Sequence, residues 1–149
     1  MSKDKSYKTA ITRKVLAAPT KLLLTRGLLS GRILDYGCGK GFCCDYLGCE
    51  GYDPYYRQAL PTGEFDTIYS TYVLNVVESS KERALVVRHI LSLLKDNGKA
   101  YISVRKDLTA LNGYTTIGTW QGDIELNLPV VYKKKNSYII WELSHASCY

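Results

Sequence analysis

The stretch that decides the fold of this 149-residue chain is Ile33-Leu34-Asp35-Tyr36-Gly37-Cys38-Gly39-Lys40-Gly41. An apolar run ends at an acidic residue, and three glycines then follow at alternate positions. Glycine is needed where a chain turns sharply off the end of a strand and where its backbone must approach a ligand closely. A helix that begins at this turn directs its free N–H groups to the same place. The stretch therefore predicts a strand, a ligand-binding turn and a short helix.

A second step from apolar to acidic residues ends at Asp53, directly after that predicted helix. Asp53 is expected at the tip of the neighbouring strand, where a carboxylate can accept both hydroxyl hydrogens of a ribose. The two steps together predict a site for a nucleoside cofactor. A standard dinucleotide fingerprint would place its third glycine at position 42, which is Phe42 here. This spacing disfavours an NAD site.

Strand and helix patterns alternate along the rest of the chain. We expect a helical segment over 7–29, strands over 32–36, 50–53, 65–70 and 99–105, helices over 41–47 and 79–94, a polar crossing over 107–123, and a hairpin of 128–132 with 137–143. This order predicts an open α/β sheet that is mostly parallel, with an antiparallel hairpin at its C-terminal edge. Ligands bind beyond the carboxyl ends of such strands, so the site is expected there.

Length and composition indicate one domain over 1–149. No apolar stretch approaches the length of a membrane span, and the charged N-terminus has no apolar signal core behind it, so we expect a cytoplasmic protein without a membrane segment. Five cysteines without a Cys-x-x-Cys pair indicate neither a disulfide framework nor a metal site. The net charge of +6 is a mild bias toward polyanionic partners. Positive residues crowd the first 26 positions and recur at 133–135.

Four motifs in order resemble those of class I S-adenosylmethionine (SAM)-dependent methyltransferases. They are the glycine stretch, Gly51-Tyr52-Asp53, the run Phe65-Asp66-Thr67-Ile68-Tyr69-Ser70-Thr71-Tyr72-Val73-Leu74, and Leu93-Leu94-Lys95-Asp96-Asn97-Gly98-Lys99-Ala100-Tyr101-Ile102. The resemblance implies a Rossmann-like sheet that binds SAM. It implies that the cofactor contacts Asp35, Tyr36, Gly37, Cys38, Gly39, Gly41, Asp53, Pro54, Tyr55 and Ser70.

A closer resemblance covers most of the chain. The segments Lys8-Thr9-Ala10-Ile11 with Arg13, Val73-Leu74-Asn75-Val76-Val77-Glu78, Val104-Arg105-Lys106-Asp107 and Gly118-Thr119-Trp120-Gln121 are similar to methyltransferases associated with DNA phosphorothioation and to small phage relatives. The resemblance implies DNA or another nucleic acid as substrate or neighbour. It implies DNA modification as the biological setting.

The chain also departs from the methyltransferase pattern. Between Asp53 and Phe65 there is no room for the family's usual helix, strand and helix, so the sheet is expected to be reduced between its second and fourth strands. The acid that contacts adenine in the family has no counterpart here. Adenine would have to rest on Tyr55, Tyr56 or side chains near 70–72. The alternative to an enzyme is a catalytically degenerate module that binds or senses SAM, or that serves as a partner subunit.

Methyl transfer is an in-line displacement at an already activated sulfonium, so the protein mainly aligns the reactants, although a neutral amine or hydroxyl acceptor can need a base or an orienting group. Tyr72 and Asn75 follow the strand over 65–70 and are the catalytic candidates by position. Substrate contacts are expected from Lys8, Arg13, Arg105 and Asp107, with an ion pair between Arg105 and Asp107 as the alternative. Residues 1–30 are expected to cover the cofactor mouth as a basic lid. A protein partner or a second copy of the chain can complete the substrate site.

Overall fold

The computed structural model describes residues 6–107, 113–115 and 118–147 of the chain. The predicted lid over 1–30 and the predicted polar crossing over 107–123 lie partly outside these residues. The elements are η1 (Ser6–Thr9), α1 (Ala18–Thr25), β1 (Ile33–Tyr36), α2 (Phe42–Leu47), β2 (Glu50–Tyr52), β3 (Phe65–Thr71), η2 (Leu74–Val76), α3 (Ser80–Ser92), β4 (Leu94–Arg105), β5 (Gly113–Tyr114), β6 (Trp120–Gln121), β7 (Val130–Lys134) and β8 (Tyr138–Leu143). Among them, no helix is long and apolar enough to cross a membrane.

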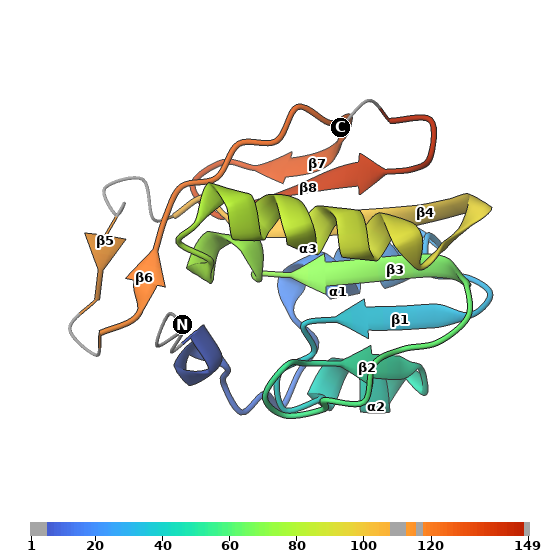
Figure 1. The fold of residues 1–149 in the computed structure, drawn as a ribbon, viewed down its shortest axis with the longest axis horizontal. Coiled ribbons are helices and arrows are strands. Elements are labelled where there is room, and N and C mark those ends of the chain that lie inside the picture. The colour runs from blue at the N-terminus through green and yellow to red at the C-terminus, as the bar shows by residue number, and fades with distance from the viewer. Residues whose placement is uncertain (1–5, 108–112, 116–117, 148–149) are drawn as a thin grey trace.

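Six strands form the central sheet in the order β2-β1-β3-β4-β8-β7 (Figure 1). The first four are parallel, while β8 runs antiparallel to β4 and β7 antiparallel to β8. The prediction of a mostly parallel α/β sheet with a C-terminal antiparallel hairpin is confirmed. The three-residue strand β2 lies at the edge of the sheet. The chain passes from β2 through a loop to β3, and this loop adds no strand beyond β2. The predicted reduction between the second and fourth family strands is therefore present.

The chain reverses its direction across the sheet between β1 and β3. From β1 it moves outward to β2, and it then returns to the other side of β1 to form β3 and β4. Such a switch point opens a crevice beyond the carboxyl ends of the strands. Figure 1 shows that η1 and the β5–β6 pair lie at the same end of the molecule as the tips of β1 and β3.

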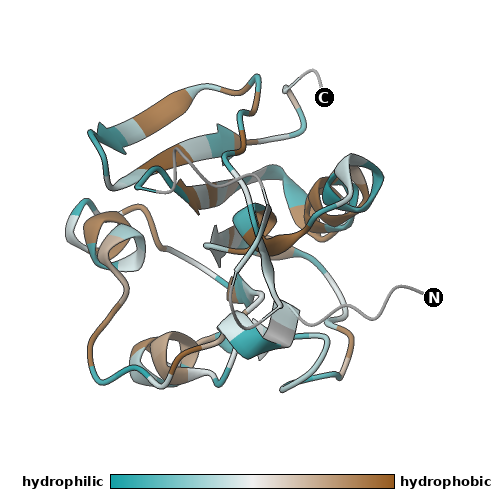
Figure 2. Ribbon diagram, turned by 90° about the vertical axis from the view of Figure 1, so that its left-hand side faces the viewer, coloured by the Kyte–Doolittle hydropathy of each residue, from teal (hydrophilic) through white to brown (hydrophobic). Residues whose placement is uncertain are grey.

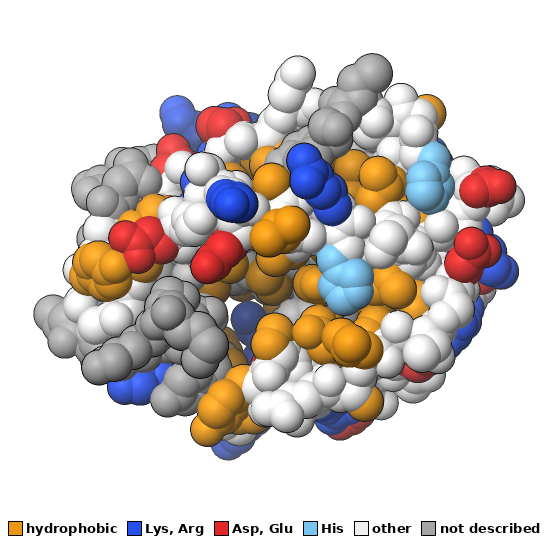
Figure 3. Space-filling model, in the orientation of Figure 1, with side chains coloured by type: hydrophobic (Ala, Val, Ile, Leu, Met, Phe, Trp, Pro, Cys, Tyr) orange, Lys and Arg blue, Asp and Glu red, His pale blue; other side chains and the backbone are white. Residues whose placement is uncertain are grey.

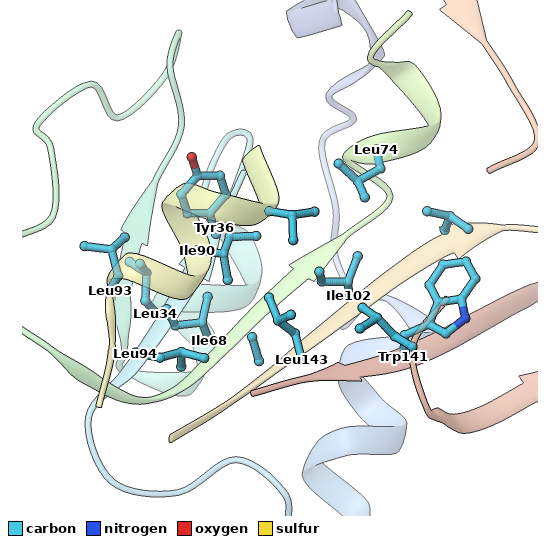
Figure 4. Packing of buried hydrophobic residues seen from close by; sticks show 14 of the residues in the cluster. Leu34, Tyr36, Ile68, Leu74, Ile90, Leu93, Leu94, Ile102, Trp141 and Leu143 are labelled. Atoms are coloured by element: carbon cyan, nitrogen blue, oxygen red, sulfur yellow. The ribbon is translucent and has the colours of Figure 1, made fainter. Parts of the chain in front are cut away.

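Hydrophobic side chains cover both faces of the sheet, and helices lie on its two sides (Figure 2). On one face α3 packs through Val87 and Ile90 onto Leu34, Ile68 and other strand residues (Figure 4). On the opposite face α1 inserts Leu23 among strand residues that include Tyr69 and Ile140. Burying a leucine or isoleucine side chain contributes about 1.5–3 kcal/mol, so these two layers fix the strand tips that carry the site.

The N-terminal segment is less helical than predicted. Residues 10–17 form no helix between η1 and α1. This stretch holds Ile11, Thr12 and Val15, whose β-branched side chains disfavour a helix. The amine of Lys40 donates to Thr12 Oγ1 over 3.0 Å, a contact that an extended chain makes. Pro19 lies in the first turn of α1, where its fixed φ suits a helix start, and Gly27, with a φ of +67°, follows the end of α1.

Two further boundaries differ from the prediction. Asn97-Gly98 does not separate α3 from its following strand, because β4 begins at Leu94 and carries an irregularity against β3 instead. A Cβ on Gly98 would lie 2.9 Å from the carbonyl oxygen of Phe65, so glycine permits this close approach. The predicted polar crossing also contains the two-stranded β5–β6 sheet, whose strands have only two residues each. Such short strands give no readable alternation.

Candidate functional site

A cavity of about 610 Å³ opens at the switch point, beyond the tips of β1 and β3. Figure 3 shows a hollow in this region that is bordered by hydrophobic side chains and has Lys or Arg atoms at depth. The cavity wall includes the predicted cofactor residues Asp35, Tyr36, Gly37, Cys38, Gly39, Gly41, Asp53, Pro54 and Tyr55. It also includes the predicted catalytic and substrate residues Arg13, Tyr72, Asn75 and Arg105. The structure thus brings most of the residues predicted for the cofactor and several of those predicted for catalysis and substrate to one cavity.

The glycine turn needs glycine for two different reasons. Gly37 has a φ of +82° and Gly41 a φ of +88°, which residues with a side chain rarely adopt. A Cβ on Gly37 would lie 2.3 Å from Val73 Cγ2, and one on Gly41 would lie 2.0 Å from a guanidinium nitrogen of Arg57. Neighbouring segments therefore press directly against the bare backbone of the turn.

The carboxylate of Asp53 is fixed by backbone amides. Its Oδ2 accepts from the amide of Gly39 over 2.9 Å, which joins the tip of β2 to the glycine turn. Its Oδ1 accepts from the amides of Tyr55 and Tyr56 over 2.9 and 3.0 Å. A carboxylate offers about four lone-pair sites, so Oδ2 has one left for a ligand. This leaves room for one ribose hydroxyl at Asp53 in this arrangement, rather than the two expected from sequence.

Asp35 is buried at the end of β1, with 4% of its surface exposed. Burial raises its pKa to about 8, with the negative charges of Cys44 and Asp53 in the same direction and a hydrogen bond from Tyr69 opposing them. The carboxyl group is therefore poised to become charged when a cation enters the cavity beside it. Tyr36, its neighbour, contributes mainly backbone, because its hydroxyl lies 2.6 Å from His89 Nδ1 on α3, away from the glycine turn.

A guanidinium clamp holds the loop that replaces the missing helix, strand and helix. Residues Asp53 and Arg57 exchange two backbone hydrogen bonds and close a tight loop. Arg57 then donates from both terminal nitrogens to the carboxylate of Asp45 on α2, over 2.9 and 2.6 Å. The sequence analysis missed this pair. Its partners lie twelve residues apart in different elements, and neither belongs to a known motif.

The N-terminal segment lies against the glycine turn. Ala10 is the neighbour that a Cβ on Gly39 would meet at 3.3 Å. The guanidinium carbon of Arg13 stands 6.0 Å from the centre of the Tyr72 ring. Ser6, Thr9, Ala10, Ile11, Arg13 and Ala17 all line the cavity. This segment therefore forms one wall of the site.

Tyr72 follows the tip of β3 in a strained conformation. Its φ is +61°, which costs a residue with a bulky side chain on the order of 1–3 kcal/mol. A hydrogen bond from its amide to the carbonyl of Ser103 holds it there over 2.9 Å. Burial raises the pKa of Tyr72, while the positive charge of Arg13 opposes this shift. The phenol is consequently a neutral hydrogen-bonding group at the cavity wall.

Asn75 is joined to a residue that the sequence analysis did not select. Its side chain is 1% exposed, and its Nδ2 donates to Gln121 Oε1 over 3.0 Å. The carbonyl oxygen of Asn75 also accepts from the amide of Gly122 over 2.9 Å. Gln121 lines the cavity from β6. The only sequence signal for it was its place in the family-like segment over 118–121.

Three predicted site residues lie away from the cavity wall. Ser70 is 1% exposed inside β3, because its position in the strand directs it into the protein rather than beyond the strand tip. Lys8 is exposed on η1. Asp107 binds the guanidinium of Arg105 over 3.0 and 2.9 Å, which is the ion-pair alternative. Arg105 itself remains on the wall.

A family model described as a methyltransferase domain matches residues 8–125, which include the glycine turn, Asp53 and the β3–η2 connection. The chain belongs to the methyltransferase domain family. Its matched region extends from the N-terminal wall of the cavity to Gln121 on β6. A comparison with curated protein sequences finds no significant match.

Solved methyltransferase structures share the fold of this methyltransferase domain. A complex of DhpI with S-adenosylhomocysteine (SAH) aligns with a TM-score of 0.60 at 14% identity, covering 84% of this chain and 82% of DhpI. The N-methyltransferase NodS of Bradyrhizobium japonicum WM9 aligns in complex with SAH with a TM-score of 0.53 at 14% identity, covering 83% of this chain and 84% of that one. At this identity the alignments show the shared Rossmann-like fold.

Proposed function

We propose that this methyltransferase takes SAM as its methyl donor and transfers the methyl group to a nucleic acid or nucleotide. The donor half of the proposal rests on the glycine turn and the two acids at the tips of β1 and β2. The acceptor half rests on the distribution of positive charge around the same cavity. The observation that carries the proposal is that the glycine turn with its two acids and the positive side chains meet at the carboxyl ends of the parallel strands.

The cavity residues fit SAM at several points. The glycine turn leaves backbone amides uncovered by side chains, and Asp53 Oδ2 retains a site for a ribose hydroxyl. Asp35 provides a buried acid for a cationic group. Tyr55 and Phe42 line the cavity near the loop that replaces the missing strand, and they supply flat surfaces for adenine. DhpI and NodS, which share the fold, were crystallised with SAH.

SAM bound there supplies a methyl group already activated on a sulfonium sulfur. The task left to the protein is to align donor and acceptor and to exclude water. The segment over 6–17 covers one side of the cavity, while Tyr72 and Asn75 form the side beyond β3. These residues would hold the acceptor in line with the methyl group.

Positive side chains surround the edge of the sheet that carries the cavity. Arg13, Lys40 and Arg105 line the cavity itself. The β7–β8 turn carries Lys134 and Lys135 to the same edge, because Tyr138 at its far side pairs with Arg105 at the end of β4. We call these five residues the basic rim. A phosphate backbone is the ligand that such a rim fits.

The motif resemblance to methyltransferases associated with DNA phosphorothioation supports the same acceptor class. It covers Arg13 and Arg105 of the basic rim, together with Asn75. Phosphate contacts of this kind position a strand without reading its sequence. The proposed acceptor is thus a strand whose backbone lies on the rim and whose reactive group reaches the cavity.

Calorimetric titration with SAM and SAH tests the donor half. Asp53→Asn keeps an oxygen for the amides of Tyr55 and Tyr56 but replaces the acceptor that faces ribose, so we expect the dissociation constant for SAM to rise by about 10–100-fold. The matched control is Asp96→Asn, an exposed aspartate after α3. Absence of binding to wild-type protein would overturn the donor assignment.

Binding of a labelled single-stranded oligonucleotide at several salt concentrations tests the acceptor half. Removing two phosphate contacts with the double variant Lys134→Ala and Lys135→Ala should lower affinity and reduce the slope of log affinity against log salt concentration by about 1.4 units. The double variant Lys95→Ala and Lys99→Ala removes the same charge from the opposite edge of the sheet, where β4 begins. Equal losses in both variants would contradict a basic rim that binds phosphate.

A further inference from the structure

Two side-chain amides lie against each other on the acceptor side of the cavity. Asn75 comes from η2, directly after β3, and Gln121 comes from β6 in the last third of the chain. One hydrogen bond joins them, from Asn75 Nδ2 to Gln121 Oε1. Asn75 Oδ1 has no hydrogen-bond partner among the residues that the structure describes, although it is buried. Two primary amides can close a ring with two hydrogen bonds, and this pair makes only one.

A buried carbonyl oxygen without a partner costs about 1–3 kcal/mol. Natural proteins rarely keep such an atom unless a ligand or water satisfies it. Asn75 and Gln121 both line the cavity, so a ligand in the cavity can reach this pair. The pair offers an acceptor at Asn75 Oδ1, and its remaining donor is Gln121 Nε2. The complementary ligand edge presents one N–H donor beside one acceptor.

We propose that the Asn75–Gln121 pair receives the amino-bearing edge of a nucleobase and selects an exocyclic amino group as the methyl acceptor. Adenine and cytosine carry this edge, with an amino group next to a ring nitrogen, and thymine lacks the amino group. The amino N–H donates to Asn75 Oδ1, and the ring nitrogen accepts from Gln121 Nε2. This inference rests on the proposed function and defines the acceptor class of the same site.

The hydrogen bond to Asn75 Oδ1 also prepares the nitrogen for reaction. It turns the amino group so that its lone pair can face the methyl group of the donor. The nitrogen lone pair forms the new N–C bond while the carbon–sulfur bond breaks and its electron pair returns to sulfur. The alkylated nitrogen then releases one proton to water. Asn75 remains neutral throughout, and no oxidant or metal is required.

The amide pair could instead act only as a structural connection between η2 and β6. Gln121→Glu separates the two roles, because its carboxylate still accepts from Asn75 Nδ2 but no longer offers a donor to the base. If the pair recognises the base, kcat/KM for the oligonucleotide falls by about 10–100-fold. The SAM dissociation constant and the melting temperature stay near those of the wild type. A Gln121→Glu enzyme with wild-type kinetics would overturn the proposal.

Asn75 is tested with a second pair of variants. Asn75→Asp keeps an acceptor oxygen, and Gln121 can turn its amide to donate to the new carboxylate. Asn75→Leu keeps the approximate volume and removes the acceptor. Because that turn takes the Gln121 donor away from the ring nitrogen, we expect Asn75→Asp to lose about tenfold in kcat/KM, as Gln121→Glu does, and Asn75→Leu to lose about a further tenfold, with SAM binding retained in both. Equal losses in Asp and Leu variants would contradict an acceptor role for Oδ1.

Transfer of tritiated methyl groups from SAM to poly(dA), poly(dC) and poly(dT) tests the acceptor class directly. Incorporation into poly(dA) or poly(dC), with none into poly(dT), is the expected result. Incorporation into poly(dT), or into none of the three, overturns the amino-group assignment. Calorimetric SAM binding on the same samples separates this failure from a failure of the donor site, in which SAM itself would not bind.

Discussion

The two ends of the cavity are built in different ways. The cofactor end uses one continuous segment from Ile33 to Arg57, in which backbone amides, three glycines and Asp53 shape the turn. The acceptor end is assembled from Arg13, from Tyr72 and Asn75 after β3, from Arg105 and from Gln121, which come from four separate parts of the chain. A continuous segment leaves a motif in the sequence. An assembled surface leaves single residues that only the folded sheet brings together.

The largest expected effect at the cofactor end follows from Gly37→Ala. The new Cβ would lie 2.3 Å from Val73 Cγ2 at a φ of +82°, so strain and overpacking act together. We expect a loss of about 3 kcal/mol in the free energy of unfolding and a loss of SAM binding of about 100-fold. Urea denaturation and calorimetry measure the two quantities.

Gly27→Ala is the matched control for Gly37→Ala. Gly27 has a φ of +67° with nothing within 4 Å of a new Cβ, so it carries the backbone strain without the contact. Gly27→Ala should lower the free energy of unfolding by about 1 kcal/mol and leave SAM binding unchanged. If both variants behave alike, the close approach of Val73 to the glycine turn has no energetic role.

At the acceptor end, Lys106→Met tests whether the assembled surface depends on a buried charge. Lys106 is 7% exposed, and its Nζ donates to Asp123 Oδ1, to the carbonyl of Ile124 and to Glu125 Oε1. These bonds hold the segment that follows Gln121. We expect about 2 kcal/mol of lost stability and about a tenfold lower rate of methyl transfer, with SAM binding retained.

The comparison for Lys106→Met is Lys99→Met on β4, the strand that ends directly before Lys106. The side chain of Lys99 is 52% exposed and pairs with Glu142 at the surface. Such a pair contributes about 0–1 kcal/mol, so this variant should transfer methyl groups like the wild type. Single-turnover assays with saturating SAM compare the two. A loss of SAM binding in Lys106→Met would show that the two ends of the cavity are not independent.

Sequence reasoning identified the succession of strands and helices and the candidate cofactor segment because their signals are local. The glycine spacing and the run of aromatic and β-branched residues over 137–143 each lie within one short stretch of the chain. Gln121 and Arg57 escaped because their roles come from contacts with Asn75 and Asp45. The prediction of a helix over 10–17 was wrong, because the contact of this segment with the glycine turn outweighed its weak preference for a helix.

The buried acid of the cofactor end gives a pH dependence that the acceptor end lacks. Asp35 has a pKa of about 8 in the folded protein, so it is mostly protonated at neutral pH. If its carboxylate receives a cationic group of SAM, affinity should rise by up to about tenfold per pH unit between about pH 6 and 8, and then level off. Calorimetry across this range, with Asp35→Asn as the flat control, measures the effect.

The same shift fixes the sign of the stability change. Between about pH 4 and 8 the folded state keeps a proton on Asp35 that the unfolded state releases. The free energy of unfolding that Asp35 contributes in the wild type therefore falls as the pH rises through this range. Asp35→Asn should not show this decline. A wild-type protein whose SAM affinity is independent of pH would remove Asp35 from the cofactor contacts.

The smallest effect concerns the clamp at the edge of the shortened sheet. Two guanidinium–carboxylate pairs flank β2, Arg57 with Asp45 beside the cavity and Arg32 with Glu50 at the opposite end of the strand. The two arginine side chains are 34% and 39% exposed, so solvent screening leaves either pair with little effect on stability. Arg57→Met should nevertheless weaken SAM binding by about fivefold, because Arg57 closes the loop that orients Asp53, whereas Arg32→Met should leave SAM binding unchanged. Calorimetry on the two variants decides whether the short clamped loop positions Asp53, and equal affinities would assign that positioning to the amide of Gly39 alone.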